Sequence, residues 1–272
     1  PYYFDLAPNR DLTVTPHLFT GALPMLQAEY RHLTSNGAMR VRGYLTYSRR
    51  SDDFLNPGPT VSSENAFRGY LDGVARMQFD ANWGASASFR LATDRTFLRR
   101  YDISSDDRLR NNIRVERIDR NSYFAINGWA VQTLRLTENQ GLQPVALPEI
   151  DYRLRFGQSL IAGGRFELQV NSLAISRSGG QDTQRAFASV RYDLRKLTAW
   201  GQEVTLTGYA RGDVYNTNDP LATSVPSYRG LEGFRGRGIA AVAMDVKWPL
   251  IGEAFGGVQR ITPRFQIVAA PR

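Results

Sequence analysis

The amino-acid sequence predicts an all-β protein, an antiparallel transmembrane β-barrel of the outer-membrane type. Two observations carry this prediction. Apolar and polar residues alternate along nearly the whole chain of 272 residues, as in strands with one face toward lipid and the other toward the lumen. The connections between these stretches are short and long in turn, because barrel strands are joined by tight turns on one side of the membrane and by larger loops on the other.

Each predicted strand is defined by its own alternation. Residues 26–31 alternate, the Asn36-Gly37 pair gives the strongest short hairpin signal, and residues 39–47 resume the alternation. Strands of about 9–11 residues are long enough to cross an outer membrane. About thirteen strands are predicted, over residues 12–18, 26–31, 39–47, 67–73, 83–91, 113–115, 123–136, 150–156, 166–175, 186–194, 204–211, 239–248 and 261–268.

The connections fall into two interleaved sets. In bacterial barrels the short set faces the periplasm and the long set faces outward. In the predicted strand at residues 166–175, apolar residues stand at even positions up to Val170 and at odd positions from Leu173. This change predicts a β-bulge near Ser172. The short connections are residues 34–37, 77–81, 119–121, 157–164 and 196–202, and the long ones are residues 49–64, 93–108, 137–146, 177–184 and 216–237.

Composition limits the alternatives. Hydrophobic residues make up 42% of the chain and the mean hydropathy is −0.38, values that also suit a soluble all-β sandwich or solenoid, so this alternative stays open. No apolar run approaches the roughly 18 residues of a transmembrane helix. Cysteine is absent, which excludes a disulfide framework and a thiolate metal site in this chain.

The basic charge of the chain comes almost entirely from arginine. The net charge is +8, and of 34 basic residues only Lys196 and Lys247 are lysines. A basic chain suggests nucleic acid as a partner, but these arginines are spread over the strands and not clustered. High genomic GC content would also enrich arginine without a functional cause.

Nine arginines are predicted on the lumen side of their strands. Guanidinium groups form charge-assisted hydrogen bonds with phosphates and carboxylates, so this wall would attract an anionic ligand such as a phosphorylated lipid. The alternative is that they pair with lumen acids such as Glu29, Asp72, Glu116 and Asp151. The nine are Arg31, Arg40, Arg42, Arg68, Arg76, Arg114, Arg153, Arg155 and Arg211.

An odd number of strands indicates an incomplete barrel. Single-chain bacterial outer-membrane barrels have even strand numbers, and open sheet edges are not tolerated in lipid. We therefore expect the sequence to be one part of a larger barrel, of about twice this size.

Four stretches carry a resemblance to a known family. They are PYYFDLAPNRDLTVTPHL at residues 1–18, EYR at 29–31, FLRRY at 97–101 and ITPR at 261–264. In this order they resemble the barrel domain of LptD (also called OstA or Imp), the lipopolysaccharide-assembly proteins of the outer membrane. The first stretch is the most specific, and the resemblance extends over the whole chain.

The resemblance implies a fold, a function and partners. Residues 1–272 would be the first strands of an LptD-type barrel of about 26 strands, with the preceding periplasmic jellyroll domain and the rest of the barrel absent. The function implied is assembly and translocation of lipopolysaccharide into the outer leaflet of a Gram-negative outer membrane, with lateral release at the seam beside the first strand. The implied partners are lipopolysaccharide, an LptE-type plug lipoprotein, and an LptA-type periplasmic bridge through the missing domain.

Three prolines are the candidate gate residues. Proline lacks an amide proton and removes a hydrogen bond from a strand ladder, so Pro1, Pro8 and Pro16 would weaken pairing at the seam. In the family, prolines near the seam ease lateral opening, and Pro1 and Pro16 match those positions best. The alternative is that residues 8–9 form a turn and that Pro16 marks a bulge.

No enzymatic site, cofactor or metal is predicted. His17 and His32 are too few for most triads or metal sites, which argues against a barrel-embedded hydrolase. The acid pairs at residues 52–53 and 106–107 are read as solvated loop charge, with cation binding beside lipid phosphates as the alternative. GFRGRG at residues 233–238 lacks the strand-to-helix context of a phosphate loop. A passive or substrate-specific porin is the alternative function, and a complete small barrel with no seam prolines and a constriction loop would favour it.

Overall fold

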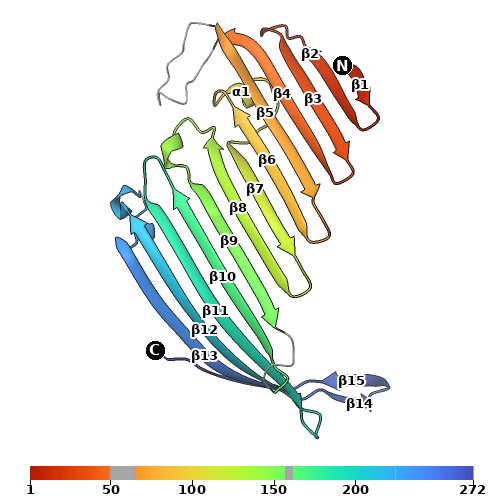
Figure 1. Ribbon diagram of the computed structural model, residues 1–272, viewed down its shortest axis with the longest axis vertical. Coiled ribbons are helices and arrows are strands. Elements are labelled where there is room, and N and C mark those ends of the chain that lie inside the picture. The colour runs from red at the N-terminus through yellow and green to blue at the C-terminus, as the bar shows by residue number, and fades with distance from the viewer. Residues whose placement is uncertain (50–64, 157–161, 224, 272) are drawn as a thin grey trace.

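The computed structural model describes residues 1–49, 65–156, 162–223 and 225–271, which form one long curved antiparallel sheet (Figure 1). Fourteen strands follow one another in chain order, except that β16 takes the place beside β13. The strands are β1 (Tyr2–Ala7), β2 (Arg10–His17), β3 (Met25–Thr34), β4 (Gly37–Arg49), β5 (Asn65–Gln78), β6 (Trp83–Ala92), β7 (Arg108–Ile118), β8 (Ser122–Thr133), β9 (Val145–Phe156), β10 (Arg165–Ser176), β11 (Asp182–Leu197), β12 (Glu203–Asn218), β13 (Gly233–Lys247) and β16 (Arg264–Ala269).

The remaining elements are short. A separate two-stranded hairpin follows β13, and one α-helical turn lies between β6 and β7. Within the described part of the chain, no helix has the length and apolar character required to cross a bilayer. These elements are β14 (Leu250–Ala254), β15 (Gly257–Ile261), α1 (Phe97–Arg100) and the 3-10 helices Gln140–Leu142, Pro220–Ala222 and Pro226–Tyr228.

Tight turns join the strands at one end of the sheet, which we call the short-turn end. It carries the turns at residues 8–9, 35–36, 79–82 and 119–121, and the opposite long-loop end carries larger connections such as residues 93–107 and 134–144. Antiparallel neighbours place successive connections at alternating ends. The predicted alternation of short and long connections therefore separates the two ends of the sheet.

Local chemistry fixes these turns. At residues 35–36, a Cβ on Gly37 would lie 2.2 Å from the backbone oxygen of Arg76, so only glycine fits this close approach of β4 and β5. In the next turn the Asp80 carboxylate accepts hydrogen bonds from the backbone N–H groups of Asn82 (2.7 Å) and Trp83 (2.8 Å). These two bonds lower the pKa of Asp80, because they stabilise its charged form.

The predicted fold class is confirmed, with one strand added at the N-terminus. The structure has fourteen strands in the main sheet, not about thirteen. β1 was missed because the sequence YYFDLA is short and does not alternate, and the first predicted strand corresponds to β2. Fourteen is even, so strand parity gives no sign of an incomplete barrel. That the chain is part of a larger barrel remains a prediction.

The prediction of one strand over residues 261–268 was wrong in its bounds. β16 begins at Arg264, and the preceding residues form the β14–β15 hairpin, which projects from the short-turn end (Figure 1). Left-handed φ angles at Phe255 (52°) and Gly256 (79°) make the hairpin turn, as in the tight turns that join antiparallel strands. The connection from β13 to β16 is therefore longer than the other connections at this end.

The predicted bulge lies on a different strand. β10 pairs with β11 without interruption from Arg165 to Ile175. The extra residue is in β9. Leu173 pairs with Glu149 and Ile175 pairs with Ala146, so one residue of β10 lies opposite the two residues 147 and 148 of β9. β8 shows the same shift against β9, and proline in a sheet is commonly found at bulges. The change in the apolar alternation of β10 therefore does not mark a bulge in this strand. It arises because the apolar residues Leu173 and Ile175 lie on the same face as the polar Gln169.

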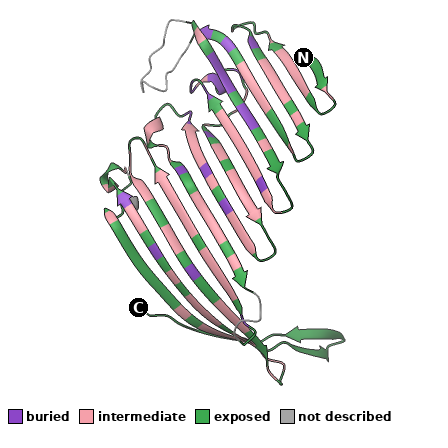
Figure 2. Cartoon of the chain, in the orientation of Figure 1, coloured by how far each residue is buried: buried purple, intermediate pink, exposed green. Residues whose placement is uncertain are grey.

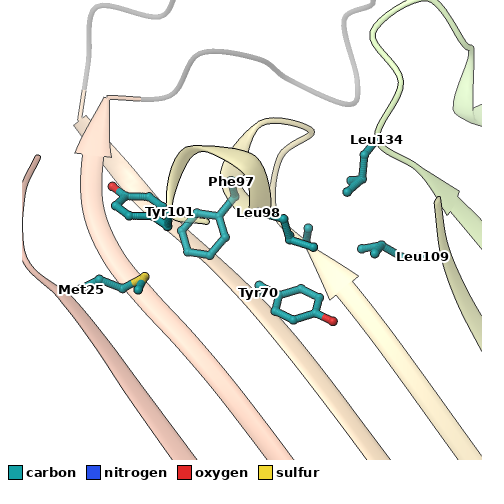
Figure 3. Packing of buried hydrophobic residues seen from close by; sticks show 8 residues of the cluster. Met25, Tyr70, Phe97, Leu98, Tyr101, Leu109 and Leu134 are labelled. Carbon is teal, nitrogen blue, oxygen red and sulfur yellow. The ribbon is translucent and has the colours of Figure 1, made fainter. Parts of the chain in front are cut away.

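The apolar core gathers at the long-loop end (Figures 2 and 3). There α1 and its flanking loop fold back onto the sheet, and eight buried side chains pack together. Elsewhere many large apolar side chains are exposed, as expected of strands whose outer face meets lipid. The cluster consists of Met25, Tyr70, Ala92, Phe97, Leu98, Tyr101, Leu109 and Leu134.

Candidate functional site

The cross-strand register places all nine predicted arginines on one face of the sheet. Directly opposed residues in neighbouring strands share a face. Arg31 opposes Arg40, and Arg42 opposes Asp72. The same parity continues across the sheet to Arg211, which opposes Ser189. We call this side the polar face, and the opposite side, which carries Leu45 and Leu71, the apolar face.

Seven of the nine arginines form ion pairs with carboxylates. The pairs lie mostly between neighbouring strands or between residues two apart on one strand, so the polar face is largely neutralised. The predicted alternative, pairing with lumen acids, therefore describes these seven. The pairs are Arg31–Asp11 (2.9 Å), Arg42–Asp72 (3.0 Å), Arg68–Asp94 (2.7 Å), Arg114–Glu116 (2.7 Å), Arg153–Asp151 (2.8 Å), Arg155–Glu167 (3.3 Å) and Arg211–Asp213 (2.5 Å).

Arg68 is the most enclosed of the nine. Its Nε and Nη2 donate to the two carboxylate oxygens of Asp94, each at 2.7 Å, and both side chains are fully buried. Further donations go to Thr96 Oγ1 (3.0 Å) and to the backbone oxygen of Arg49 (3.1 Å), and the guanidinium lies 5.7 Å from the ring centroid of Phe97. Arg68 therefore holds the β6–β7 loop on the sheet and is not open to a ligand.

The electrostatics of Asp94 follow from this contact. Burial alone would raise the pKa of Asp94, but the hydrogen bonds and positive charge of Arg68, with bonds from Thr96, outweigh it and lower the pKa. Hydrogen bonds and an opposite charge both favour the ionised form of a carboxyl group. The carboxylate therefore remains ionised in the folded protein at neutral pH.

The two acids at residues 106 and 107 each form an ion pair with a different arginine. Asp106 accepts from Arg90 at 2.7 Å, and Asp107 accepts from Arg135 at 2.5 Å. The bond from Arg90, helped by Ser104, lowers the pKa of Asp106. Each carboxylate is thus engaged in the protein's own ion pairs. Across the described ranges, no group of three or more metal-ligating side chains is close enough to hold an ion, and the acid pair at residues 52–53 lies outside those ranges.

Arg40 and Arg76 differ from the other seven. Both side chains are exposed, and neither has a carboxylate partner in the part of the chain that the structure describes. Both line a cavity of about 970 Å³ at the short-turn end of the polar face. Its walls come from β1 to β7, and sequence reasoning missed its neutral polar members, Tyr3, Ser86, Ser88 and Asn112, although polar residues at alternate positions of a strand were a usable signal.

The family of the chain follows from comparison with known sequences. The profile of the family described as "LptD: LPS transport system D" matches residues 66–272. The chain belongs to the LptD family. The resemblance to this family is thereby confirmed, with the stretches at residues 97–101 and 261–264 inside the matched range, and so is the outer-membrane barrel fold class. The family description is of a transport system, in agreement with the expectation that the protein is not an enzyme.

Curated LptD-family relatives give a similar result. The chain is 30% identical to "LPS-assembly protein LptD" of Marinobacter nauticus over 171 residues, which is 60% of this chain and 20% of that protein. It is 25% identical to the protein of the same name from Actinobacillus pleuropneumoniae over 173 residues, 62% of this chain and 21% of that protein. A 36-residue stretch is 56% identical to the Psychrobacter arcticus protein, 13% of this chain and 4% of that protein. The chain thus aligns with about a fifth of the length of the first two.

The three candidate gate prolines of this LptD-family chain lie around the edge strand β1. Pro1 directly precedes β1, and Pro8 lies in the turn to β2 and lines the cavity. Pro16 is on β2, not on the first strand as the sequence indicated, because β1 was not anticipated. The last pair of β1 with β2 is Tyr2 with Val14, so Pro16 lies beyond it and is paired only with Leu26 of β3.

The other chemistry-bearing residues form no site. His17 Nε2 is 2.9 Å from Gln27 Oε1, which satisfies the ring as a polar strand residue. His32 opposes Arg10 across β2 and β3 and lines the cavity that holds Arg40 and Arg76. Residues 233–238 open strand β13 and are followed by more strand, so the GFRGRG stretch has no phosphate-loop geometry.

Proposed function

We propose that this LptD-family chain takes part in the assembly and translocation of lipopolysaccharide into the outer leaflet of a Gram-negative outer membrane. The observation that carries the proposal is a single continuous sheet with one apolar face and one polar face that includes all nine predicted arginines, in a family described as a lipopolysaccharide transport system. An apolar outer face suits lipid. On the inner face, Arg40 and Arg76, which have no carboxylate partner among the described residues, suit the phosphates and carboxylates of the cargo.

The release step is proposed to occur at the edge of β1. This strand has only six residues, and its pairing with β2 is interrupted between Asp5 and Ala7. A short and irregular edge strand forms few ladder hydrogen bonds, so separating it from a closing strand costs less than separating long strands. Pro1 precedes β1, Pro8 follows it and Pro16 lies on β2 beyond the last pair with β1. Because proline donates no hydrogen bond, these residues would keep the seam strand from extending its pairing at either end.

The chain is proposed to be the first part of a larger LptD-type barrel. A preceding periplasmic jellyroll domain would connect it to an LptA-type bridge, and an LptE-type lipoprotein would occupy the lumen. The chain aligns with about a fifth of the length of each of the first two relatives. This supports the proposal that it forms part of a longer protein.

Depletion of the full-length parent protein in its host tests this function. Loss of surface lipopolysaccharide, with accumulation behind the outer membrane, is expected. Normal surface lipopolysaccharide together with altered uptake of small solutes would reject the proposal and favour a porin.

A valine at position 16 tests the gate. Pro16→Val restores an amide proton and a good strand former, so the seam should tighten and surface lipopolysaccharide should fall, measured against an equal amount of assembled protein. Pro226→Val, in the loop between β12 and β13, is the matched control and should leave export unchanged. Unimpaired export in the Pro16 variant would contradict the gate role.

A porin is the second candidate, and one observation favours it. The β6–β7 loop folds onto the polar face and is held there by the buried Arg68–Asp94 pair, as a constriction loop would be. Solute uptake in the depletion experiment separates the two candidates.

A further inference from the structure

Arg40 and Arg76 lie next to each other on the polar face. Arg40 of β4 directly opposes Val74 of β5, and Arg76 is two positions further along β5 on the same side. Diagonal neighbours of this kind have Cβ atoms roughly 7 Å apart. Because an arginine side chain is long and ends in a planar fork, the two guanidinium groups can contact one ligand between them.

The cavity carries an excess of positive charge, because four arginines (Arg10, Arg31, Arg40 and Arg76) but only two carboxylates (Asp5 and Asp11) line it among the described residues. Arg40 is also directly opposite Arg31, and like charges directly opposed across strands are destabilising. Arg31 is compensated by Asp11 at 2.9 Å, whereas no carboxylate contacts Arg40 or Arg76 among the described residues. A bound anion would remove this repulsion.

Neutral hydrogen-bonding groups lie beside the two arginines on β6 and β7. Ser86 directly opposes Arg76, Ser88 opposes Val74, and Asn112 opposes Ser88. All three side chains line the cavity, and within the described ranges none of them makes a side-chain hydrogen bond. Hydroxyl and amide groups donate readily to phosphate oxygens. The cavity volume of about 970 Å³ is enough for a phosphorylated sugar headgroup.

We propose that Arg40 and Arg76, with Ser86, Ser88 and Asn112, bind a phosphate group at the short-turn end of the polar face. The proposal rests on the proposed function and assigns the phosphate to the lipopolysaccharide headgroup. Free inorganic phosphate has the same chemistry and is the other source. The cavity also reaches β1 and its turn at Pro8, so a bound headgroup would lie beside the edge strand at the side where the cargo arrives.

Photo-crosslinking on the full-length parent protein tests the site. A benzophenone amino acid at Ala38, which opposes Arg76 and lines the cavity, reports occupancy by purified lipopolysaccharide. Charge-assisted hydrogen bonds are the strong ones, so the adduct should fall about tenfold or more in the Arg40→Ala/Arg76→Ala variant. The same loss is expected with lipopolysaccharide from which the lipid phosphates have been removed. Arg191→Ala is the matched control, because Arg191 lies on the same face but is paired with Asp193 at 2.7 Å, and its adduct should stay within about twofold.

The outcomes separate the alternatives. An undiminished adduct in the double alanine variant, or with the dephosphorylated lipid, would overturn the proposal. Suppression of the adduct by inorganic phosphate at cellular concentration would overturn the headgroup assignment and identify free phosphate as the ligand. The Arg40→Lys/Arg76→Lys variant guards against misfolding, since it keeps the charge and should retain part of the adduct. Normal surface lipopolysaccharide after depletion would reject the proposed function, whereas loss of crosslinking alone would reject only this site.

Discussion

Arg68 and Arg76 lie on the same strand and the same face of the sheet, yet their surroundings are opposite. Arg68, at the long-loop end, is fully buried and bonds Asp94, Thr96 and a backbone oxygen. Arg76, at the short-turn end, is exposed and lines an open cavity. The difference shows that the strand determines the face on which an arginine side chain lies. The loop or turn at that end of the strand determines whether the side chain is buried in an ion pair or remains exposed to a ligand.

The length of the connections explains this difference. The β6–β7 loop of residues 93–107 is long enough to fold back over the sheet and place Phe97, Leu98 and Tyr101 on it (Figure 3). An ion pair between Arg135 and Asp107 ties it to the next loop, and Arg108, the first residue of β7, pairs with Glu138 of that next loop. At the other end, the turns that join β1 to β2, β3 to β4, β5 to β6 and β7 to β8 have two to four residues and cannot cover the face, so a cavity remains there.

Removing the carboxylate of Asp94 should have the largest effect. Asp94→Asn leaves the Arg68 charge buried without its counter-ion, and breaking a buried pair in this way costs about 3–5 kcal/mol. Denaturant unfolding of the detergent-solubilised protein measures the loss. Asp119→Asn, which breaks an exposed pair with Arg117, is the control and should cost less than about 1 kcal/mol. Equal effects of the two changes would mean that the loop does not depend on Arg68.

Truncating Phe97 should have the next largest effect. The side chain is fully buried against Tyr101 and the Arg68 guanidinium, and Phe→Ala at such sites costs about 3 kcal/mol or more. Limited proteolysis of the β6–β7 loop should become faster. Leu136→Ala, an exposed loop position, serves as the control and should not change the rate.

Acid should remove the contribution of the Arg68–Asp94 pair. The folded-state pKa of Asp94 is lowered, because Arg68 outweighs the effect of burial. The stabilisation is therefore complete above the unfolded value of about 3.9 and is lost as pH falls through the folded pKa. The melting-temperature difference between wild type and Asp94→Asn should stay constant from pH 7 to about pH 5 and shrink below about pH 4. A difference that already shrinks near neutral pH would contradict a lowered pKa.

Removing the side chain of Arg76 should have the smallest effect on stability. Arg76→Ala breaks no ion pair and relieves repulsion from Arg40, so the free energy of unfolding should change by less than about 0.5 kcal/mol. The same unfolding measurement as for Asp94→Asn gives the direct contrast between the two ends of β5. A loss of more than about 1 kcal/mol would show that Arg76 has a structural partner in the intact protein.

The sequence by itself determined the strands and their faces. Alternation has a period of two residues, and this period places side chains on a face whatever the strand pairs with, so alternation alone assigns all nine arginines to one side of the sheet. The hairpin at Asn36-Gly37 was equally readable from these two residues, although the structure places the turn at residues 35–36 and Gly37 at the start of β4, where it closely approaches the backbone of Arg76. β1 and the β14–β15 hairpin were not found, because short segments without alternation carry no periodic signal.

Only the tertiary structure decided which charges are free. Seven arginines meet an acid, and one of these pairs, Arg68 with Asp94, joins residues 26 positions apart. Such contacts depend on how a loop folds over the sheet, and alternation contains no information on loop folding. Arg40 and Arg76 can be distinguished from the other seven arginines only once the carboxylate partners of those seven are known. The physical reason is that side-chain direction is set locally by the strand, whereas the burial of Arg68 and its pairing with Asp94 are set by a loop distant in sequence.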